Sequence, residues 1–205
     1  MKKLLFISLL SMFSVNMTIA QYKEISGTMG LLLNSSGESE YGTIDIANGW
    51  VLGGTFGYDI ADYWQAELFW NMARASTNHS AGDDPATIFD MTYQNIHLGV
   101  NRYFGEYDDF VPYVGLSTGV TLYDPKTETS GGKTLWSLAS TVGFKIFPVP
   151  DHPRWGFKTH FRLYIPMAFD GRELFTDEAG DSGLLVPVIH GEFSGGFVYR
   201  FLPKK

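Results

Sequence analysis

Residues 136–146 read Trp-Ser-Leu-Ala-Ser-Thr-Val-Gly-Phe-Lys-Ile. Five large apolar residues from Trp136 to Ile146 share one parity, and the opposite parity carries Ser, Ala, Thr, Gly and Lys. Because successive side chains of a strand point to opposite faces, this period of two indicates a β-strand rather than a helix. A sheet face in water usually carries long polar side chains, whereas this polar face consists mainly of small residues. The segment predicts a strand with one strongly apolar face and one face of small residues.

The same alternation recurs along the chain, more cleanly in some segments than in others. We predict eight strands, near residues 23–33, 50–60, 63–73, 92–104, 111–123, 134–147, 154–168 and 188–201. The connections alternate between long polar ones (34–49, 74–91, 124–133, 169–187) and short ones (61–62, 105–110, 148–153). Long loops at one end and tight turns at the other are typical of an up-and-down antiparallel barrel. An even number of strands places both chain ends at the short-turn end.

The composition agrees with an all-β chain. The chain has 205 residues, of which 18% are charged and 16% aromatic, with 23 glycines. Few charges with many aromatic residues and glycines argue against disorder, a coiled coil and a helical bundle. The net charge of −7 excludes a global basic field for nucleic acid, and the absence of Cys excludes disulfides and a Cys nucleophile.

The N-terminus has the three parts of a secretory signal peptide. Lys2 and Lys3 are followed by the apolar run of residues 4–10, and Thr18-Ile19-Ala20 resembles a cleavage site. A membrane-anchor helix is the alternative, but it needs about 20 apolar residues. We therefore predict a signal peptide over residues 1–20 and one barrel domain over residues 21–205.

The two faces of the strands decide between a soluble and a membrane barrel. A soluble barrel buries its apolar face, and a membrane barrel turns that face to the lipid. Small residues on the other face suit the narrow inside of an eight-stranded barrel. Aromatic residues, which favour membrane interfaces, lie near the strand ends: Trp50, Tyr58, Trp64, Trp70, Trp136, Trp155, Tyr199 and Phe201. We predict an all-β, eight-stranded antiparallel up-and-down transmembrane β-barrel, with a soluble periplasmic lipocalin-like ligand binder as an alternative.

Two stretches resemble a known family. Val111-Pro112-Tyr113-Val114-Gly115-Leu116-Ser117-Thr118-Gly119-Val120 and the closing Gly195-Gly196-Phe197-Val198-Tyr199-Arg200-Phe201 are similar to strands of the small porin-like outer-membrane β-barrels, the superfamily that includes the barrel of outer-membrane protein A. The chain departs from that pattern because residues 202–205 follow the terminal aromatic residue.

The resemblance implies an integral protein of the Gram-negative outer membrane with both termini in the periplasm. Its implied partners are outer-membrane lipid and lipopolysaccharide, and the outer-membrane assembly machinery, which would read the C-terminal strand. No nucleic acid is expected.

The polar faces of the predicted strands carry charges. Because a charge inside a narrow barrel is costly without a partner, we expect a structural ion network in the lumen. Its predicted members are Glu24, Glu67, Lys145, Lys158, Arg162, Glu192 and Arg200; Asp59, His97, His160 and His190 share the same faces. Counting along adjacent strands predicts two ion pairs, Arg162–Glu192 and Glu24–Arg200, with Lys158 or His160 able to replace Arg162 if the register shifts. A selectivity lining for a narrow pore is the alternative.

Catalysis has weak support in the sequence. Outer-membrane lipid A deacylases use His, Ser and Glu on an eight-stranded barrel, and Asn78-His79-Ser80 invites the comparison. These residues fall in a predicted loop, and neighbours in an extended chain point to opposite sides. The three inward histidines lack the short spacing of metal ligands. We expect no catalytic residue, metal or cofactor, and a structural, adhesive or narrow-pore role; a barrel-embedded lipid A hydrolase is the alternative.

Overall fold

The computed structural model describes residues 22–34, 37–39, 42–80, 85–105, 110–125, 132–148, 154–167 and 189–201. The described residues form ten strands: β1 Lys23–Asn34, β2 Gly37–Ser39, β3 Gly42–Ile46, β4 Gly49–Ala61, β5 Trp64–Ser80, β6 Pro85–Tyr103, β7 Phe110–Pro125, β8 Lys133–Ile146, β9 Trp155–Met167 and β10 His190–Phe201. All eight predicted strands are present, as β1 and β4 to β10. The predicted signal peptide, residues 1–20, lies outside the described residues.

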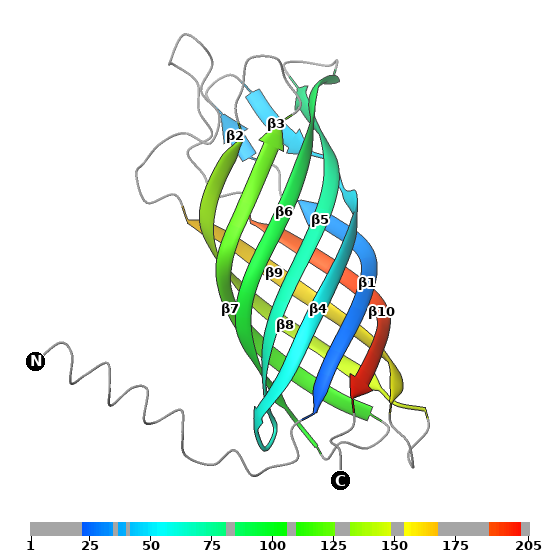
Figure 1. Ribbon diagram of the computed structural model, residues 1–205. Coiled ribbons are helices and arrows are strands. Elements are labelled where there is room, and N and C mark those ends of the chain that lie inside the picture. The colour runs from blue at the N-terminus through cyan, green and yellow to red at the C-terminus, as the bar shows by residue number, and fades with distance from the viewer. Residues whose placement is uncertain are drawn as a thin grey trace, which may run out of the picture.

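Eight of these strands close into a barrel (Figure 1). β1 pairs with β10 along its whole length, from Lys23 opposite Phe201 to Asn34 opposite His190, and pairs with β4 on its other edge. Each remaining strand of the barrel pairs with its neighbours in the chain, and every pairing is antiparallel. Closure removes the unpaired sheet edges that lipid could not satisfy with hydrogen bonds. The predicted eight-stranded up-and-down topology is confirmed.

Two predicted loops are partly strand. Residues 74–91 were expected to form a loop, but β5 continues to Ser80 and β6 begins at Pro85, so most of this segment is a hairpin that prolongs the barrel wall. Within the expected loop 34–49, β2 and β3 form a second small hairpin, whose strand β3 pairs with the end of β5. In Figure 1, β2, β3 and the ends of β5, β6 and β7 rise beyond β1, β9 and β10. We call this part the sheet extension.

The apolar faces of the strands point out of the barrel. Leu116 is 69% exposed, Leu98 61% and Phe193 56%, whereas Tyr164 and His190 on the opposite faces are fully buried. Side chains with more than half of their surface exposed in this way would be costly in water but match the hydrocarbon of a bilayer. The apolar side chains therefore point outward, as in a transmembrane barrel. In a soluble lipocalin-like barrel they would point inward. Among the described residues, no helix is long and apolar enough to cross a membrane.

The interior changes character along the barrel axis. At the end that carries the sheet extension, a buried apolar cluster contains Leu32, Val51, Met91, Tyr93 and Tyr123. At the short-turn end, a second cluster contains Tyr103, Tyr113 and Phe147. Between and around these clusters, buried charged and amide side chains fill the lumen.

Candidate functional site

The ion network of the lumen is the candidate site, and its first part lies at the short-turn end. Glu24 of β1 sits between two cations: Arg200 Nη2 lies 2.8 Å from Glu24 Oε1, and Lys145 Nζ contacts Glu24 Oε2. Gln65 Nε2 donates to Glu24 at 3.1 Å and to Asp59 at 2.9 Å. The Arg200 guanidinium also lies 3.9 Å from the ring centre of Phe147. At this end of the lumen, the paired charges therefore pack beside an aromatic ring.

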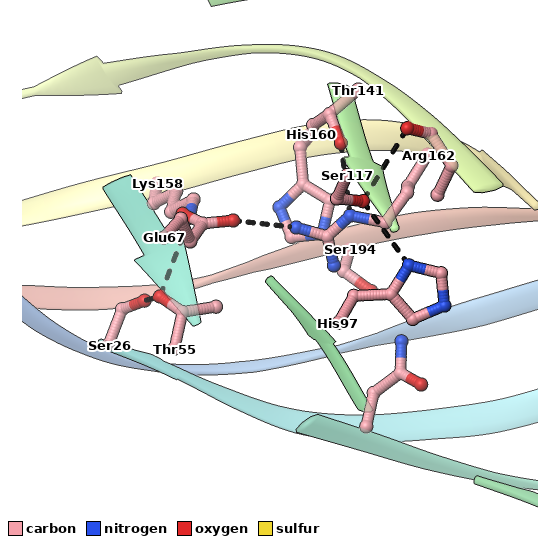
Figure 2. A network of polar contacts seen from close by, with 12 residues as sticks. Ser26, Thr55, Glu67, His97, Ser117, Thr141, Lys158, His160, Arg162 and Ser194 are labelled. Atoms are coloured by element: carbon pink, nitrogen blue, oxygen red, sulfur yellow. Dashed lines mark hydrogen bonds and ion pairs between the residues drawn. The ribbon is translucent and has the colours of Figure 1, made fainter. Parts of the chain in front are cut away.

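The second part crosses the middle of the lumen at Glu67. Figure 2 shows Arg162 and Lys158, both on β9, facing Glu67 on β5. Arg162 Nη2 lies 3.0 Å from Glu67 Oε1, and Lys158 Nζ contacts Glu67 Oε2. Because β9 and β5 are four strands apart in either direction around the barrel, these ion pairs span the lumen rather than follow one wall. All three side chains are buried.

The Arg162 side chain is fixed along its length. Its Nε donates to Thr141 Oγ1 at 3.1 Å, and its guanidinium carbon lies 3.6 Å from the ring centre of Phe69. A cation over an aromatic face adds a favourable interaction in a desolvated site. Together with the Glu67 contact, these partners hold the guanidinium in one position in the lumen.

The third part surrounds Glu192 on β10, towards the sheet extension. Tyr164 and Ser194 each donate a hydroxyl to this carboxylate at 2.6 Å, Asn71 donates its amide at 2.5 Å, and His160 Nε2 lies 3.2 Å away. A carboxylate that accepts several hydrogen bonds is stabilised in its buried, charged form.

A chain of neutral hydrogen bonds continues from Glu192 around the wall. Asn95 donates to Asn71 at 2.8 Å, and Thr121 donates its hydroxyl to Asn95 at 2.6 Å. Ser137 Oγ lies 2.8 Å from Thr121 Oγ1 and 2.8 Å from His97 Nε2. These hydrogen bonds connect strands β5, β6, β7 and β8 inside the barrel. Such connected networks rigidify an interior when each polar group is satisfied.

Both predicted registers are confirmed. Glu24 lies opposite Arg200 in the β1–β10 pairing, and Arg162 lies opposite Glu192 in the β9–β10 pairing. The details of the second pair differ from the expectation, because Arg162 is 3.8 Å from Glu192 and only 3.0 Å from Glu67. Lys158, expected as a substitute for Arg162 at Glu192, binds Glu67 instead. All seven predicted network residues are buried and in contact with at least one other charged member.

Sequence reasoning missed the neutral members of the network. Gln65 and Asn71 share the parity of Glu67 in β5, so the alternation of residues 63–73 carried the signal that both face the lumen. Tyr103 donates its hydroxyl to Gln65 Oε1 at 2.5 Å. Its place in the lumen could not be predicted from the sequence, because tyrosine is compatible with either face of a strand.

The contacts of the described lumen serines and histidines differ from those of a serine nucleophile. In the described part of the lumen, Ser194 donates its proton to Glu192 rather than to His160, and His97 contacts the hydroxyls of Ser137 and Ser117, at 2.8 and 3.3 Å. A serine nucleophile needs its proton taken by a histidine that an acid orients. Asn78-His79-Ser80, expected in a loop, belong to β5. No group of three His, Asp or Glu residues among the described residues is arranged to hold a metal ion.

Comparison with solved structures identifies barrels of the same kind. The outer-membrane protein OprG of Pseudomonas aeruginosa is 18% identical, with a TM-score of 0.64 over 89% of this chain and 97% of OprG. Neisserial surface protein A is 14% identical, with a TM-score of 0.58 over 88% of this chain and 97% of that protein. The outer-membrane protein AlkL, solved in lipid bilayers, is 14% identical, with a TM-score of 0.56 over 94% and 95% of the two chains.

No family model matches the chain, and no curated protein sequence matches it. The similarity to the solved barrels therefore rests on three-dimensional structure, and it agrees with the resemblance of residues 111–120 and 195–201. The chain has the fold of the small eight-stranded outer-membrane β-barrels.

Proposed function

We propose that this protein is an integral outer-membrane barrel with a closed lumen, which serves a structural or adhesive role and carries no enzymatic activity. The observation that carries the proposal is the set of ion pairs across the lumen, from Lys158 and Arg162 to Glu67. An eight-stranded barrel is only wide enough for side chains to fill, so charges that pair across it leave no room for a continuous water column.

The sheet extension supports the adhesive form of the proposal. β5 has 17 residues and β6 has 19, whereas about 9–11 residues suffice to cross a bilayer. Strands of this length carry a hydrogen-bonded sheet beyond the membrane, and β3 widens it along the edge of β5. A sheet anchored in this way offers a partner a preformed surface, so little conformational entropy of this protein is lost on binding.

Conductance across a planar lipid bilayer tests the closed lumen. We expect the purified wild-type barrel to give no steady open-channel current in potassium chloride. The double variant Glu67→Ser/Arg162→Ser removes two of the side chains that meet in the middle, so we expect it to raise the current. Leu138→Ala, on the barrel wall but facing the lipid, is the matched control and should leave the current unchanged.

Each variant is first shown to fold by its heat-dependent mobility in gel electrophoresis, since a folded barrel migrates differently until it is heated. A steady wild-type current at neutral pH would favour the narrow-pore role instead. Hydrolysis of lipid A by the purified wild type would contradict the non-enzymatic part of the proposal.

A further inference from the structure

The outer surface of the barrel has a groove that the lumen network does not explain. It has a volume of about 660 Å³ and runs over β1, β9 and β10, with a lining of Ile25, Ser26, Gly27, Arg154, Trp155, Phe197, Tyr199 and Phe201. Most of the lining is apolar and faces the lipid, but one end carries the exposed residue Arg154.

The depth of the groove comes from Gly27. It lies on the outward face of β1 between Ile25 and Met29, which are 46% and 57% exposed. A Cβ atom at Gly27 would meet no other atom within 4 Å, so the missing side chain leaves open space. Across the β1–β10 pairing, Gly27 lies opposite Phe197, which forms the facing wall.

That facing wall is a ladder of aromatic rings. Trp155 and Tyr199 lie 4.7 Å apart between ring centres, Tyr199 and Phe201 4.9 Å, and Phe157 and Phe197 5.0 Å. Because these rings pack against one another, the wall keeps its shape, and an alkyl chain in the groove would contact rigid apolar surface on one side.

The short-turn end of the groove is positively charged. Arg154, an exposed residue of the lining, directly precedes β9, and its backbone oxygen accepts from Arg200 N at 2.7 Å, so that its backbone is held beside β10. Lys23, which begins β1, is turned towards the other neighbouring strand, where its ammonium lies 5.9 Å from the ring centre of Tyr58 on β4. In the described parts of β1, β9 and β10 and the residue that precedes β9, no acidic side chain faces outward at this end.

We propose that this groove binds one anionic phospholipid, with an acyl chain over Gly27 and its phosphate at Arg154. The groove is apolar along its length and cationic at the membrane interface, which is the polarity profile of such a lipid. A second copy of the chain fits less well. A two-fold axis along the membrane normal would bring Arg154 of both copies to the same height, where like charges repel.

A second groove on the barrel wall has the same combination of an apolar lining with an arginine and a tryptophan at one end. It has a volume of about 400 Å³, is lined by apolar residues that include Val100, Val142 and Phe161, and ends at Arg102 beside Trp64. The Arg102 guanidinium lies 5.2 Å from the ring centres of both Tyr63 and Trp64. The recurrence of a groove that ends at an arginine and a tryptophan supports the assignment.

Quenching of Trp155 by brominated lipid tests the proposal. The full-length protein is reconstituted into phosphatidylcholine vesicles that contain increasing fractions of brominated phosphatidylglycerol or, separately, brominated phosphatidylcholine. The Trp155 signal is the difference between each protein and its Trp155→Phe counterpart. We expect half-maximal quenching of the wild type at about a fivefold lower fraction of phosphatidylglycerol than of phosphatidylcholine, since one basic residue near an anionic headgroup contributes about that factor.

The variants separate the two parts of the site. Arg154→Gln should bring the preference for phosphatidylglycerol close to one. Gly27→Leu should fill the groove and weaken quenching by both lipids, while Gly27→Ala should have a smaller effect. Arg102→Gln, on the opposite wall, is the matched control and should leave the Trp155 signal unchanged.

Three results would overturn the proposal. Equal quenching of the wild type by the two lipids would mean that the groove holds only unselected bilayer lipid. Unchanged quenching in Gly27→Leu, with the barrel shown to be folded by heat-dependent mobility, would place the lipid elsewhere. Protection of Trp155 from both lipids, together with a cross-linked dimer, would make a second copy the occupant. None of these outcomes depends on whether the lumen conducts.

Discussion

Glu67 and Glu192 illustrate two ways of keeping a carboxylate inside a membrane barrel. Glu67 has two cationic partners, Lys158 and Arg162, whereas Glu192 is surrounded mainly by neutral donors, Tyr164, Ser194 and Asn71, with His160 at 3.2 Å. Removing one partner of a buried ion pair leaves a lone charge, which typically costs about 3–5 kcal/mol. Glu67 therefore depends more strongly on its cations than Glu192 does.

A pair of double-mutant cycles measures this difference. We expect Arg162→Ala and Glu67→Ala to be coupled by about 1–3 kcal/mol, and Arg162→Ala and Glu192→Ala to be coupled more weakly, because the nitrogen–oxygen distances are 3.0 and 3.8 Å. The free energies come from urea unfolding in lipid vesicles. Additive losses at Glu67 would show that the ion pair across the lumen contributes nothing to stability.

At the scale of a strand, the two faces of β9 have opposite surroundings. Phe161 lies at the middle of Trp155–Met167 and points outward, 38% exposed, while its neighbours His160 and Arg162 are buried in the lumen. A shift of one residue in the pairing would exchange these faces. The register of β9 is therefore fixed by the lipid on one side and by Glu67 and Glu192 on the other.

The outward face of β9 gives a prediction for stability. Phe161→Arg places a cation near the middle of the hydrocarbon, so we expect it to lower the free energy of unfolding in lipid by about 2–4 kcal/mol. Phe161→Leu keeps an apolar side chain at the same place and should cost much less. The same urea titration compares both variants with the wild type. A neutral Phe161→Arg would contradict the assigned facing.

Strand elements in the membrane were predictable from the sequence, and those beyond it were not. Inside the bilayer one face must be apolar, so the alternation is visible in residues 136–146 and 154–168. In the sheet extension both faces can be polar, so residues 74–80 and 85–91 lose the period of two and resemble a loop. The pairing between β5 and β6, which continues from Trp64 opposite Arg102 to Ser80 opposite Pro85, makes them strands.

At the scale of the whole barrel, neighbours along the wall were predictable, and partners across the lumen were not. Pairing between adjacent strands follows from turn length and closure, which located Arg162 opposite Glu192 and Glu24 opposite Arg200. The contact of Arg162 with Glu67 depends on the tilt and stagger with which the eight strands close, and no local pattern encodes these. The contacts of the ion network across the lumen could therefore be identified only from the three-dimensional structure.

The orientation of the barrel in the membrane remains a prediction of the loop pattern. Barrels of this kind have short turns on the periplasmic side and longer connections outside the cell. In Figure 1, the sheet extension lies at the opposite end of the barrel from the start of β1 and the end of β10. We therefore expect the connections at 34–49, 74–91, 124–133 and 169–187 to face outside, with both termini in the periplasm.

Epitope tags test this orientation directly. A tag inserted at Gly82 or Gly180, both outside the described residues, should bind antibody on intact cells, because Gly82 falls between the long strands β5 and β6 and Gly180 falls in the long connection between β9 and β10. A tag at Asp108, in the short connection between β6 and β7, is the control and should bind only after the outer membrane is permeabilised. Heat-dependent mobility confirms that each tagged barrel is folded. The reverse pattern, with Asp108 reachable on intact cells and Gly82 hidden, would invert the barrel and place the proposed anionic-lipid groove at Arg154 in the outer leaflet.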